Sequence, residues 1–133
     1  PTINLSEEKK NSFFIRDLIN KKIALSVHDI SDGGIALTIA EMCMSGKIGA
    51  NITTNLIDAE RIKFLFGEDQ ARYVIEVKSA DYDSIVKLAK EKEVSLLQIG
   101  STKAENLTID DMKITVEDML TLNNKWFHNY NSN

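Results

Sequence analysis

A polar turn with two adjacent glycines, at positions 28–34, most constrains how this chain can fold. The turn reads His-Asp-Ile-Ser-Asp-Gly-Gly, and it follows a compact apolar run at 23–27 that is typical of a buried strand. An amphipathic helix is predicted directly after the turn, over 35–44, with Gly46 as its C-terminal cap. The sequence therefore predicts a strand that turns through Asp and Gly into the N-terminus of a helix.

Two interpretations of this turn are open on the residues alone. Free backbone N–H groups at a helix N-terminus, beside carboxylates, suit an anionic ligand or a cation that bridges a carboxylate to a phosphate. Alternatively, Ser31 or Asp32 caps the helix, and the glycines only allow a tight turn. By itself the turn favours the structural interpretation and does not identify a function.

Length and charge argue against several classes of protein. A chain of 133 residues predicts one domain, over 1–133, that forms a core without disulfides or metal. With 20 acidic against 16 basic residues and no basic stripe, nucleic acid is not an expected partner. No apolar run approaches the ~20 residues of a membrane span. No signal peptide is apparent, so no membrane partner is expected either.

Two single residues add expectations about context. Cys43 lies on the apolar face of the predicted helix, and it is interpreted as a core residue of a protein in a reducing, cytoplasmic setting. The chain opens on Pro1 without an initiator methionine, which favours a domain cut from a longer polypeptide. Such a domain is expected to expose an apolar patch, with the segments 33–44 and 13–18 as candidates.

The rest of the chain alternates helices and strands without a repeat or a low-complexity linker. Hydrophobic periodicity predicts helices over 6–19, from Asp58, over 82–92 and over 119–126. Strands are expected over 48–53, 72–77 and 94–101, and in a hairpin of 107–109 and 112–116; residues 129–133 are expected to fray. The pattern predicts an α+β or α/β fold with helices against a mixed sheet of four or more strands.

Two blocks of sequence, in this order, resemble one enzyme family. The first is the 28–34 turn, followed by Ala-Glu-Met at 40–42 and by glycines at 46 and 49. The second is Leu-Phe-Gly-Glu-Asp-Gln-Ala-Arg at 65–72, which leads into the strand at 73–77. Together they resemble the C-terminal domain of phosphoribosylformylglycinamidine synthase, in the superfamily of aminoimidazole ribonucleotide synthetase. The resemblance implies a three-layer α/β/α sandwich with a mixed sheet that is partly ferredoxin-like.

The resemblance also implies an ATP-dependent ligase of purine biosynthesis that works in the cytoplasm. Such an enzyme uses ATP and magnesium to convert formylglycinamide ribonucleotide to formylglycinamidine ribonucleotide, and a glutaminase domain or subunit supplies ammonia. The remainder of the synthetase chain is therefore an implied partner. Because this sequence holds no Gly-rich phosphate loop with a lysine, the chain is expected to be inactive alone, and no catalytic residue is assigned.

Site residues in the turn follow from the resemblance, position by position. Asp29 is the implied magnesium ligand, and Gly33 and Gly34 are the implied nucleotide contacts. The carboxylate of Asp29 is then expected to point out of the core, whereas Asp32 is expected to bend back and cap the helix. His28 is interpreted as a hydrogen-bonded structural histidine, since the only other histidine is far away in sequence.

The loop at 68–70 matches a Glu-Ser-Gln run that contacts substrate in the related first copy of the synthetase unit. Glu68, Asp69 and Gln70 are therefore the implied substrate contacts. Asp69 stands in place of the serine and departs from the family pattern, because it adds a negative charge where a phosphorylated substrate would lie. Arg72 could pair with Glu68 or another buried acid, or reach a phosphate, and the pair within the chain is predicted.

The last apolar side chains carry a further expectation. Trp126 and Phe127, beside Leu122, are predicted to close the core, whereas an exposed pair would indicate a lost domain interface.

Two alternatives to the synthase interpretation remain open. The nearer is a domain of another ATP-dependent member of the superfamily, of the small-molecule kinase type. The more distant is a binding or regulatory module without a link to catalysis.

Overall fold

The computed structural model describes residues 4–131, except the side chains of Lys103, Ala104, Phe127, His128, Asn129 and Asn131. The chain divides into two compact units, of which the first holds Pro1–Thr38 with Ile62–Gln98 and the second holds Ile39–Arg61 with Ile99–Asn133. Two of the divisions fall inside helices, α2 (Gly34–Gly46) and α3 (Asp58–Phe66). The single domain over 1–133 stays a prediction, and the two units are described in turn.

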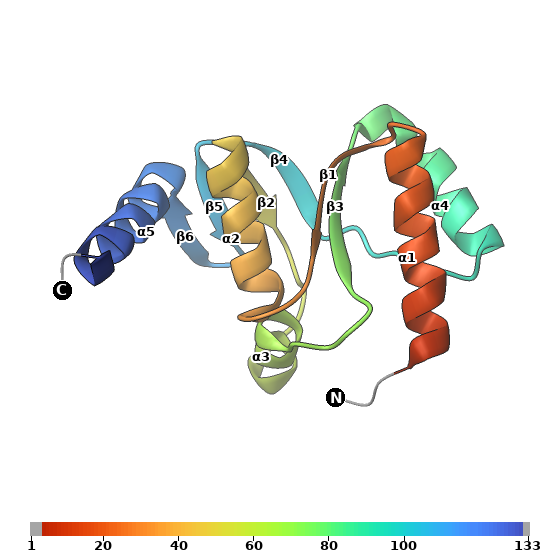
Figure 1. The fold of residues 1–133 in the computed structure, drawn as a ribbon, viewed down its shortest axis with the longest axis horizontal. Helices are drawn as coiled ribbons and strands as arrows, with labels where there is room; N and C mark the ends of the chain where they lie inside the picture. Colours follow the sequence, from red (N-terminus) through yellow and green to blue (C-terminus); the bar gives the residue numbers. More distant parts are fainter. Residues whose placement is uncertain (1–3, 132–133) are drawn as a thin grey trace. The chain divides into compact units, whose positions relative to one another are not determined.

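The first unit pairs two strands beneath two helices. Its elements are α1 (Leu5–Asn20), β1 (Ala24–Asp29), β3 (Tyr73–Val77), a 3-10 turn η1 (Ser79–Asp81) and α4 (Tyr82–Glu91). Strands β1 and β3 are antiparallel, with Val27 opposite Ile75. Helices α1 and α4 lie side by side (Figure 1). Helix α1 begins because the Asn4 side chain accepts a hydrogen bond from the N–H of Glu7.

The core of the first unit lies between these helices and the strand pair. It is built from Phe14, Leu18, Ile85 and Ala89, with Ile75 of β3 among the side chains packed against it. Burying one such aliphatic side chain contributes about 1.5–3 kcal/mol. Because Phe14 and Leu18 are buried here, the segment 13–18 is not the apolar patch that we expected, although Phe13 is 42% exposed.

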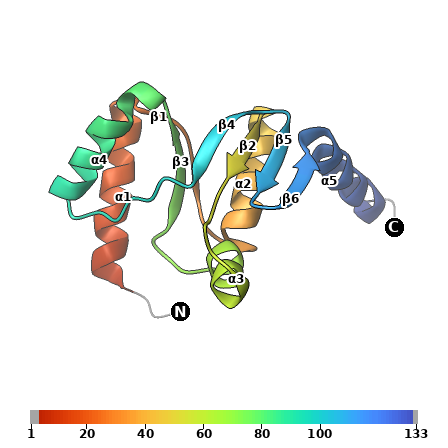
Figure 2. The same ribbon diagram turned by 180° about the vertical axis from the view of Figure 1, so that it is seen from behind.

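The second unit is built on a mixed four-stranded sheet in the order β4-β2-β5-β6. The strands are β2 (Gly49–Ile52), β4 (Gly100–Ala104), β5 (Asn106–Ile109) and β6 (Met112–Thr115), and the last helix is α5 (Val116–Asn131). Strand β2 runs parallel to β5, and the other two pairs are antiparallel. Figure 2 shows these strands, with α5 following β6. The α+β class with a mixed sheet is therefore confirmed.

Most predicted elements form, and the strand expected over 94–101 is wrong. Val94 and Leu96 are half-buried against the core of the first unit, so their alternation marks an extended segment. Residues 94–99 nevertheless belong to no strand, and β4 begins at Gly100. Strand β4 starts where a strand was expected to end. A Cβ on Gly100 would lie 2.0 Å from the backbone oxygen of Asn51, so glycine is what allows β4 to approach β2 so closely.

The C-terminal helix is longer than predicted, and large apolar side chains of its later turns are exposed. Helix α5 continues to Asn131, through positions that were expected to fray, and the last two residues lie outside the described range. Leu122 is 60% and Trp126 is 65% exposed, so the prediction that they close the core is wrong for both. The side chain of Phe127 lies outside the description. None of the described helices combines the length and apolar character needed to cross a membrane.

Candidate functional site

The glycine turn rests directly on the C-terminal end of α3. Gly33 and Gly34 have φ angles of +77° and +65°, which glycine adopts without strain. A Cβ on Gly34 would lie 2.6 Å from the backbone oxygen of Leu65 and 2.8 Å from backbone atoms of Phe66. The two blocks singled out in the sequence, 28–34 and 65–72, are therefore in contact within the first unit.

Glu68 joins the two blocks by a hydrogen bond. The backbone N–H of Gly33 donates to Oε1 of Glu68 over 2.9 Å, and the N–H of Gly34 donates to the backbone oxygen of Ser31 over 3.0 Å. A carboxylate at a helix N-terminus is stabilised by the unpaired N–H groups and the helix dipole. The donors proposed for a phosphate thus have partners inside the chain.

The cap expected from Asp32 is not formed. Its side chain is exposed and makes no hydrogen bond to any described residue, and Glu68 stands at the helix N-terminus in its place. The reason is the backbone path. Both glycines lie in the left-handed region, and α2 starts at Gly34, one residue before the predicted helix. The sequence correctly located a cap at this turn but assigned it to the wrong carboxylate.

Asp29 presents its carboxylate to solvent, as predicted. Its side chain is 70% exposed, whereas its backbone oxygen accepts a hydrogen bond from the hydroxyl of buried Thr38 over 3.4 Å. Nδ1 of His28 lies 2.6 Å from the same backbone oxygen, and since a carbonyl only accepts, Nδ1 carries the proton in this contact. The backbone of Asp29 is thus fixed on both sides, which holds the carboxylate at the end of β1.

Magnesium bound at Asp29 would need further ligands. Among the described residues, no group of three His, Cys, Asp or Glu side chains is placed to hold a metal ion. A single hard carboxylate suits Mg²⁺ when phosphate oxygens and water complete its coordination. The donor chemistry of Asp29 therefore fits one position of a shared metal site and not a self-contained one.

The loop at 68–70 is held at Asp69 by Arg72 and at Glu68 by the N–H of Gly33. Nη1 of Arg72 lies 3.5 Å from Oδ2 of Asp69, so the pairing acid is Asp69. The same guanidinium donates to the backbone oxygens of Gly67 and Phe64, each over 3.4 Å, at the C-terminal end of α3. The charge by which Asp69 departs from the family pattern is thus matched within the chain. Gln70 lies exposed beside it.

A partly buried hydrogen bond between Tyr73 and Glu8, near Asp29, is not predicted by the sequence. The hydroxyl of Tyr73, which pairs with Asp29 across β1 and β3, donates to Oε1 of Glu8 over 3.1 Å. Burial, followed by the hydrogen bond and charge of Glu8, raises the pKa of Tyr73 above its usual 10.0. Glu8 and Tyr73 are far apart in sequence, so no local pattern could have paired them.

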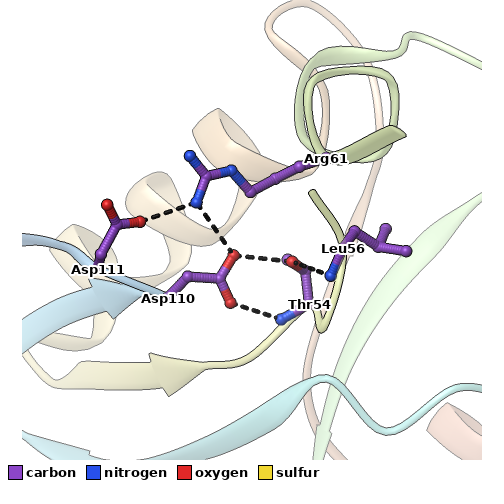
Figure 3. A network of polar contacts seen from close by, with 5 residues as sticks. All are labelled: Thr54, Leu56, Arg61, Asp110 and Asp111. Carbon is purple, nitrogen blue, oxygen red and sulfur yellow. Dashed lines mark hydrogen bonds and ion pairs between the residues drawn. The ribbon is translucent and has the colours of Figure 1, made fainter. Parts of the chain in front are cut away.

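The second unit holds its own polar cluster, drawn in Figure 3. Oδ1 of Asp110 accepts from the N–H of Thr54 over 2.8 Å, and Oδ2 accepts from its hydroxyl over 2.7 Å. These bonds hold the pKa of Asp110 below its ordinary value. Arg61 contacts Asp111 over 2.8 Å and Asp110 over 4.0 Å. The sequence predicts only the hairpin over 107–109 and 112–116, in whose turn Asp110 and Asp111 lie, and not their contacts with Thr54 and Arg61.

Comparison with known proteins identifies the family. A family model described as "AIR synthase related protein, C-terminal domain" matches residues 5–111. The chain belongs to this family. The match includes both blocks, and the resemblance on which they were chosen is confirmed; helix α5 lies beyond it.

Two curated relatives of this AIR synthase-related chain carry the same name, phosphoribosylformylglycinamidine synthase subunit PurL. The protein of Pelagibacter ubique is 38% identical over 134 residues, and that of Bartonella quintana is 40% identical over 128 residues. The alignments cover 100% and 96% of this chain. The chain spans only 18% and 17% of the length of these relatives.

Solved structures share the fold of the AIR synthase-related chain. PurL of Thermotoga maritima complexed with FGAR matches with a TM-score of 0.71 at 16% identity, over 85% of this chain and 21% of that one. The same protein complexed with ATP matches with a TM-score of 0.70 at 15% identity, over 84% and 21%. At these identities the likeness concerns the fold.

Proposed function

We propose that this chain is the C-terminal domain of a phosphoribosylformylglycinamidine synthase of the PurL type. The observation that carries the proposal is the extent of the relatives' alignment. Proteins named as this synthase align with essentially the whole chain, including α5, which the broader family model does not reach. The contact between the 28–34 turn and the loop after α3 supports the same assignment, because it unites the two blocks that resemble the synthase.

The proposed reaction is the ATP-dependent conversion of formylglycinamide ribonucleotide to formylglycinamidine ribonucleotide in purine biosynthesis. The amide oxygen of the substrate attacks the γ-phosphorus of ATP, and ADP leaves. Ammonia then adds to the activated carbon, and phosphate leaves with the former amide oxygen. The balance is one ATP and one ammonia consumed for one ADP, one phosphate and one amidine formed.

Within this reaction, the proposed roles belong to the first unit. Magnesium, when bound, neutralises charge on the phosphoryl group that is transferred. Asp29 is the proposed ligand, because its carboxylate is exposed while its backbone is held by His28 and Thr38.

Nucleotide contact by Gly33 and Gly34 is proposed with one condition. The N–H of Gly33 is hydrogen-bonded to Glu68, so this group reaches a phosphate only if Glu68 releases it. Gly34 donates to Ser31 in the same way. The main proposed role of the two glycines is therefore to form the turn, and contact with the nucleotide is an additional role.

The proposed substrate contacts belong to a loop that is anchored at both sides, and they are Glu68, Asp69 and Gln70. Arg72 holds Asp69 from one side, and the N–H of Gly33 holds Glu68 from the other. Gln70 is exposed between these two anchored positions and the strand β3, so it is the member best placed to reach a ligand.

The proposed partners are the remainder of the synthase polypeptide and a glutaminase that supplies ammonia, in the cytoplasm. This chain alone is proposed to be inactive, because the halves of an active site built between domains are each insufficient.

The test is a direct assay of the protein encoded by the whole open reading frame. With formylglycinamide ribonucleotide, ATP, magnesium and ammonium salt, formation of formylglycinamidine ribonucleotide with equal ADP is the expected result. Residues 1–133 assayed alone are expected to release no ADP above a protein-free control. Substrate-dependent turnover by the 133-residue chain, or its absence from the full protein, would overturn the proposal.

A further inference from the structure

The apolar face of α5 extends beyond the surface that covers it. At the start of the helix Val116 and Met119 are buried, each 7% exposed. Further along, Leu122, Trp126 and Tyr130 are 60%, 65% and 71% exposed. At 100° per residue, Met119, Trp126 and Tyr130 lie within about 40° of one another around the helix. The same face is therefore buried where α5 begins and uncovered where it ends.

The uncovered end is ordered as a packed aromatic surface. The rings of Trp126 and Tyr130 stack with centroids 5.5 Å apart and an interplanar angle of 16°. We call Leu122, Trp126 and Tyr130, which follow at intervals of four along α5, the distal stripe. Large aromatic side chains that are left in solvent in this way mark an interaction site more often than an accident of the surface.

The distal stripe lies in a part of the chain that the family model does not match. The family model ends at residue 111, before α5 begins at Val116. The alignment with the synthase relatives, in contrast, covers the whole chain, and those relatives are more than five times as long, since the chain spans 18% of the first. The surface that covers the distal stripe is therefore expected in the longer synthase polypeptide and not in the domain that the family shares.

We propose that the distal stripe docks onto another part of a longer synthase polypeptide, outside these 133 residues. The inference rests on the proposed function, because the longer polypeptide is that of the synthase. It also agrees with the expectation that an uncovered Trp126 indicates a missing domain interface. A second copy of this chain is the competing occupant, and the experiment below separates the two.

Hydroxyl-radical footprinting of the full-length protein tests the docking without any mutation. Trypsin cleaves after Lys125, and no Lys or Arg follows within these 133 residues, so one peptide that begins at Trp126 reports on both Trp126 and Tyr130. Docking is expected to lower their oxidation rates about fivefold against the same protein unfolded in urea, as in the buried centre of an interface. If Trp126 and Tyr130 stay 65% and 71% exposed in the full-length protein, folding should lower their oxidation rates by less than about twofold. A decrease that small would overturn the proposal.

Two variants and a dilution series complete the test. In the full-length protein, Trp126→Ser is expected to raise the oxidation rate of Tyr130 several-fold, because it opens the docked face. Asn124→Ser, on the opposite side of α5, is the matched control and is expected to leave that rate unchanged. Protection that disappears on dilution would assign the stripe to a second copy and overturn the docking proposal.

The amidine-forming assay keeps the two proposals apart. A full-length protein that makes formylglycinamidine ribonucleotide while Trp126 reacts freely retains the function and refutes the docking. A protein that protects Trp126 but makes no amidine refutes the function, and with it the identity of the docking partner.

Discussion

At the scale of single residues, the turn at 28–34 is held by a side chain that lies 35 positions further along the chain. Glu68 accepts the N–H of Gly33, and the exposed carboxylate of Asp32, although adjacent in sequence, does not. A local pattern identifies which kind of group caps a helix, but it cannot choose between a neighbouring carboxylate and one delivered by tertiary contact. The choice here follows from the glycine backbone, which turns Asp32 away.

Glu68→Ala is therefore predicted to destabilise the chain, by about 1 kcal/mol, as the loss of a helix cap does. Urea unfolding followed by circular dichroism measures the change. Asp32→Ala is the matched control, and its effect should stay within about 0.5 kcal/mol, as for exposed residues without partners. The opposite ranking of the two variants would restore Asp32 as the cap.

Asp29→Asn separates the scaffold from the proposed metal site. The hydrogen bonds of Asp29 are made by its backbone oxygen, and its carboxylate is 70% exposed and lies 3.6 Å from Nδ1 of His28. Since an exposed ion pair contributes little, stability should change by less than about 0.5 kcal/mol. In the full-length protein the same change should weaken retention of magnesium nucleotide, measured by equilibrium dialysis. A variant that unfolds the chain but leaves nucleotide retention intact would make Asp29 a structural residue.

At the scale of elements, the start of α2 and the end of α3 meet without space for a side chain. Gly34→Ala places a Cβ 2.6 Å from the backbone oxygen of Leu65 and puts alanine at a φ of +65°. We predict a loss of at least about 2 kcal/mol in the free energy of unfolding. In Gly46→Ala the nearest atom is a side-chain atom, Cγ2 of Ile48 at 3.3 Å, and no positive φ is imposed, so this control should lie within about 1 kcal/mol of the parent. Equal effects would show that the contact between the turn and α3 is not formed.

The free energy of unfolding is expected to depend on pH through Asp110, which lies at the turn between β5 and β6. The Thr54 N–H, then its hydroxyl, lower the pKa of Asp110 below 3.8 in the folded chain. The stabilisation is therefore present above the unfolded pKa and is lost as pH falls through the folded one.

The stability difference between the parent and Asp110→Asn should accordingly shrink as pH is lowered from about 6 to about 3. Unfolding curves at several pH values measure it. Asp111→Asn is the control, because that carboxylate is 76% exposed and, within the described part of the chain, has Arg61 as its hydrogen-bond partner. A difference that grows toward low pH would contradict the assigned hydrogen bonds.

Periodicity found most of these elements, and it failed where the partner of a segment is distant. The alternation of Val94 and Leu96 marks an extended chain with one buried side, but hydrogen bonding to another strand is a separate property that the pattern does not report. The distal stripe shows the same limit. An apolar helix face is visible in the sequence, but whether its own domain or another part of a longer polypeptide covers that face is not.

At the scale of the whole molecule, the chain matches one segment of much longer relatives, since it spans 18% and 17% of their lengths. The family followed from two short blocks of glycines and acids at fixed spacing, and the class of helices against a mixed sheet followed from hydrophobic periodicity. The residue roles did not follow so directly, because they depend on which side chains the fold brings together.

A domain exchange tests the central claim most directly. The segment of Pelagibacter ubique PurL that aligns with this chain is replaced by residues 1–133, and amidine formation is measured with ammonia as the nitrogen source. A parallel exchange with the Bartonella quintana segment, which is 40% identical to this chain, controls for mismatched interfaces. If this chain is the synthase domain, its chimera should turn over within about a hundredfold of the parent, since a misplacement of about 1 Å at an interface can cost that much in rate. A folded but inactive chimera, beside an active control, would contradict it.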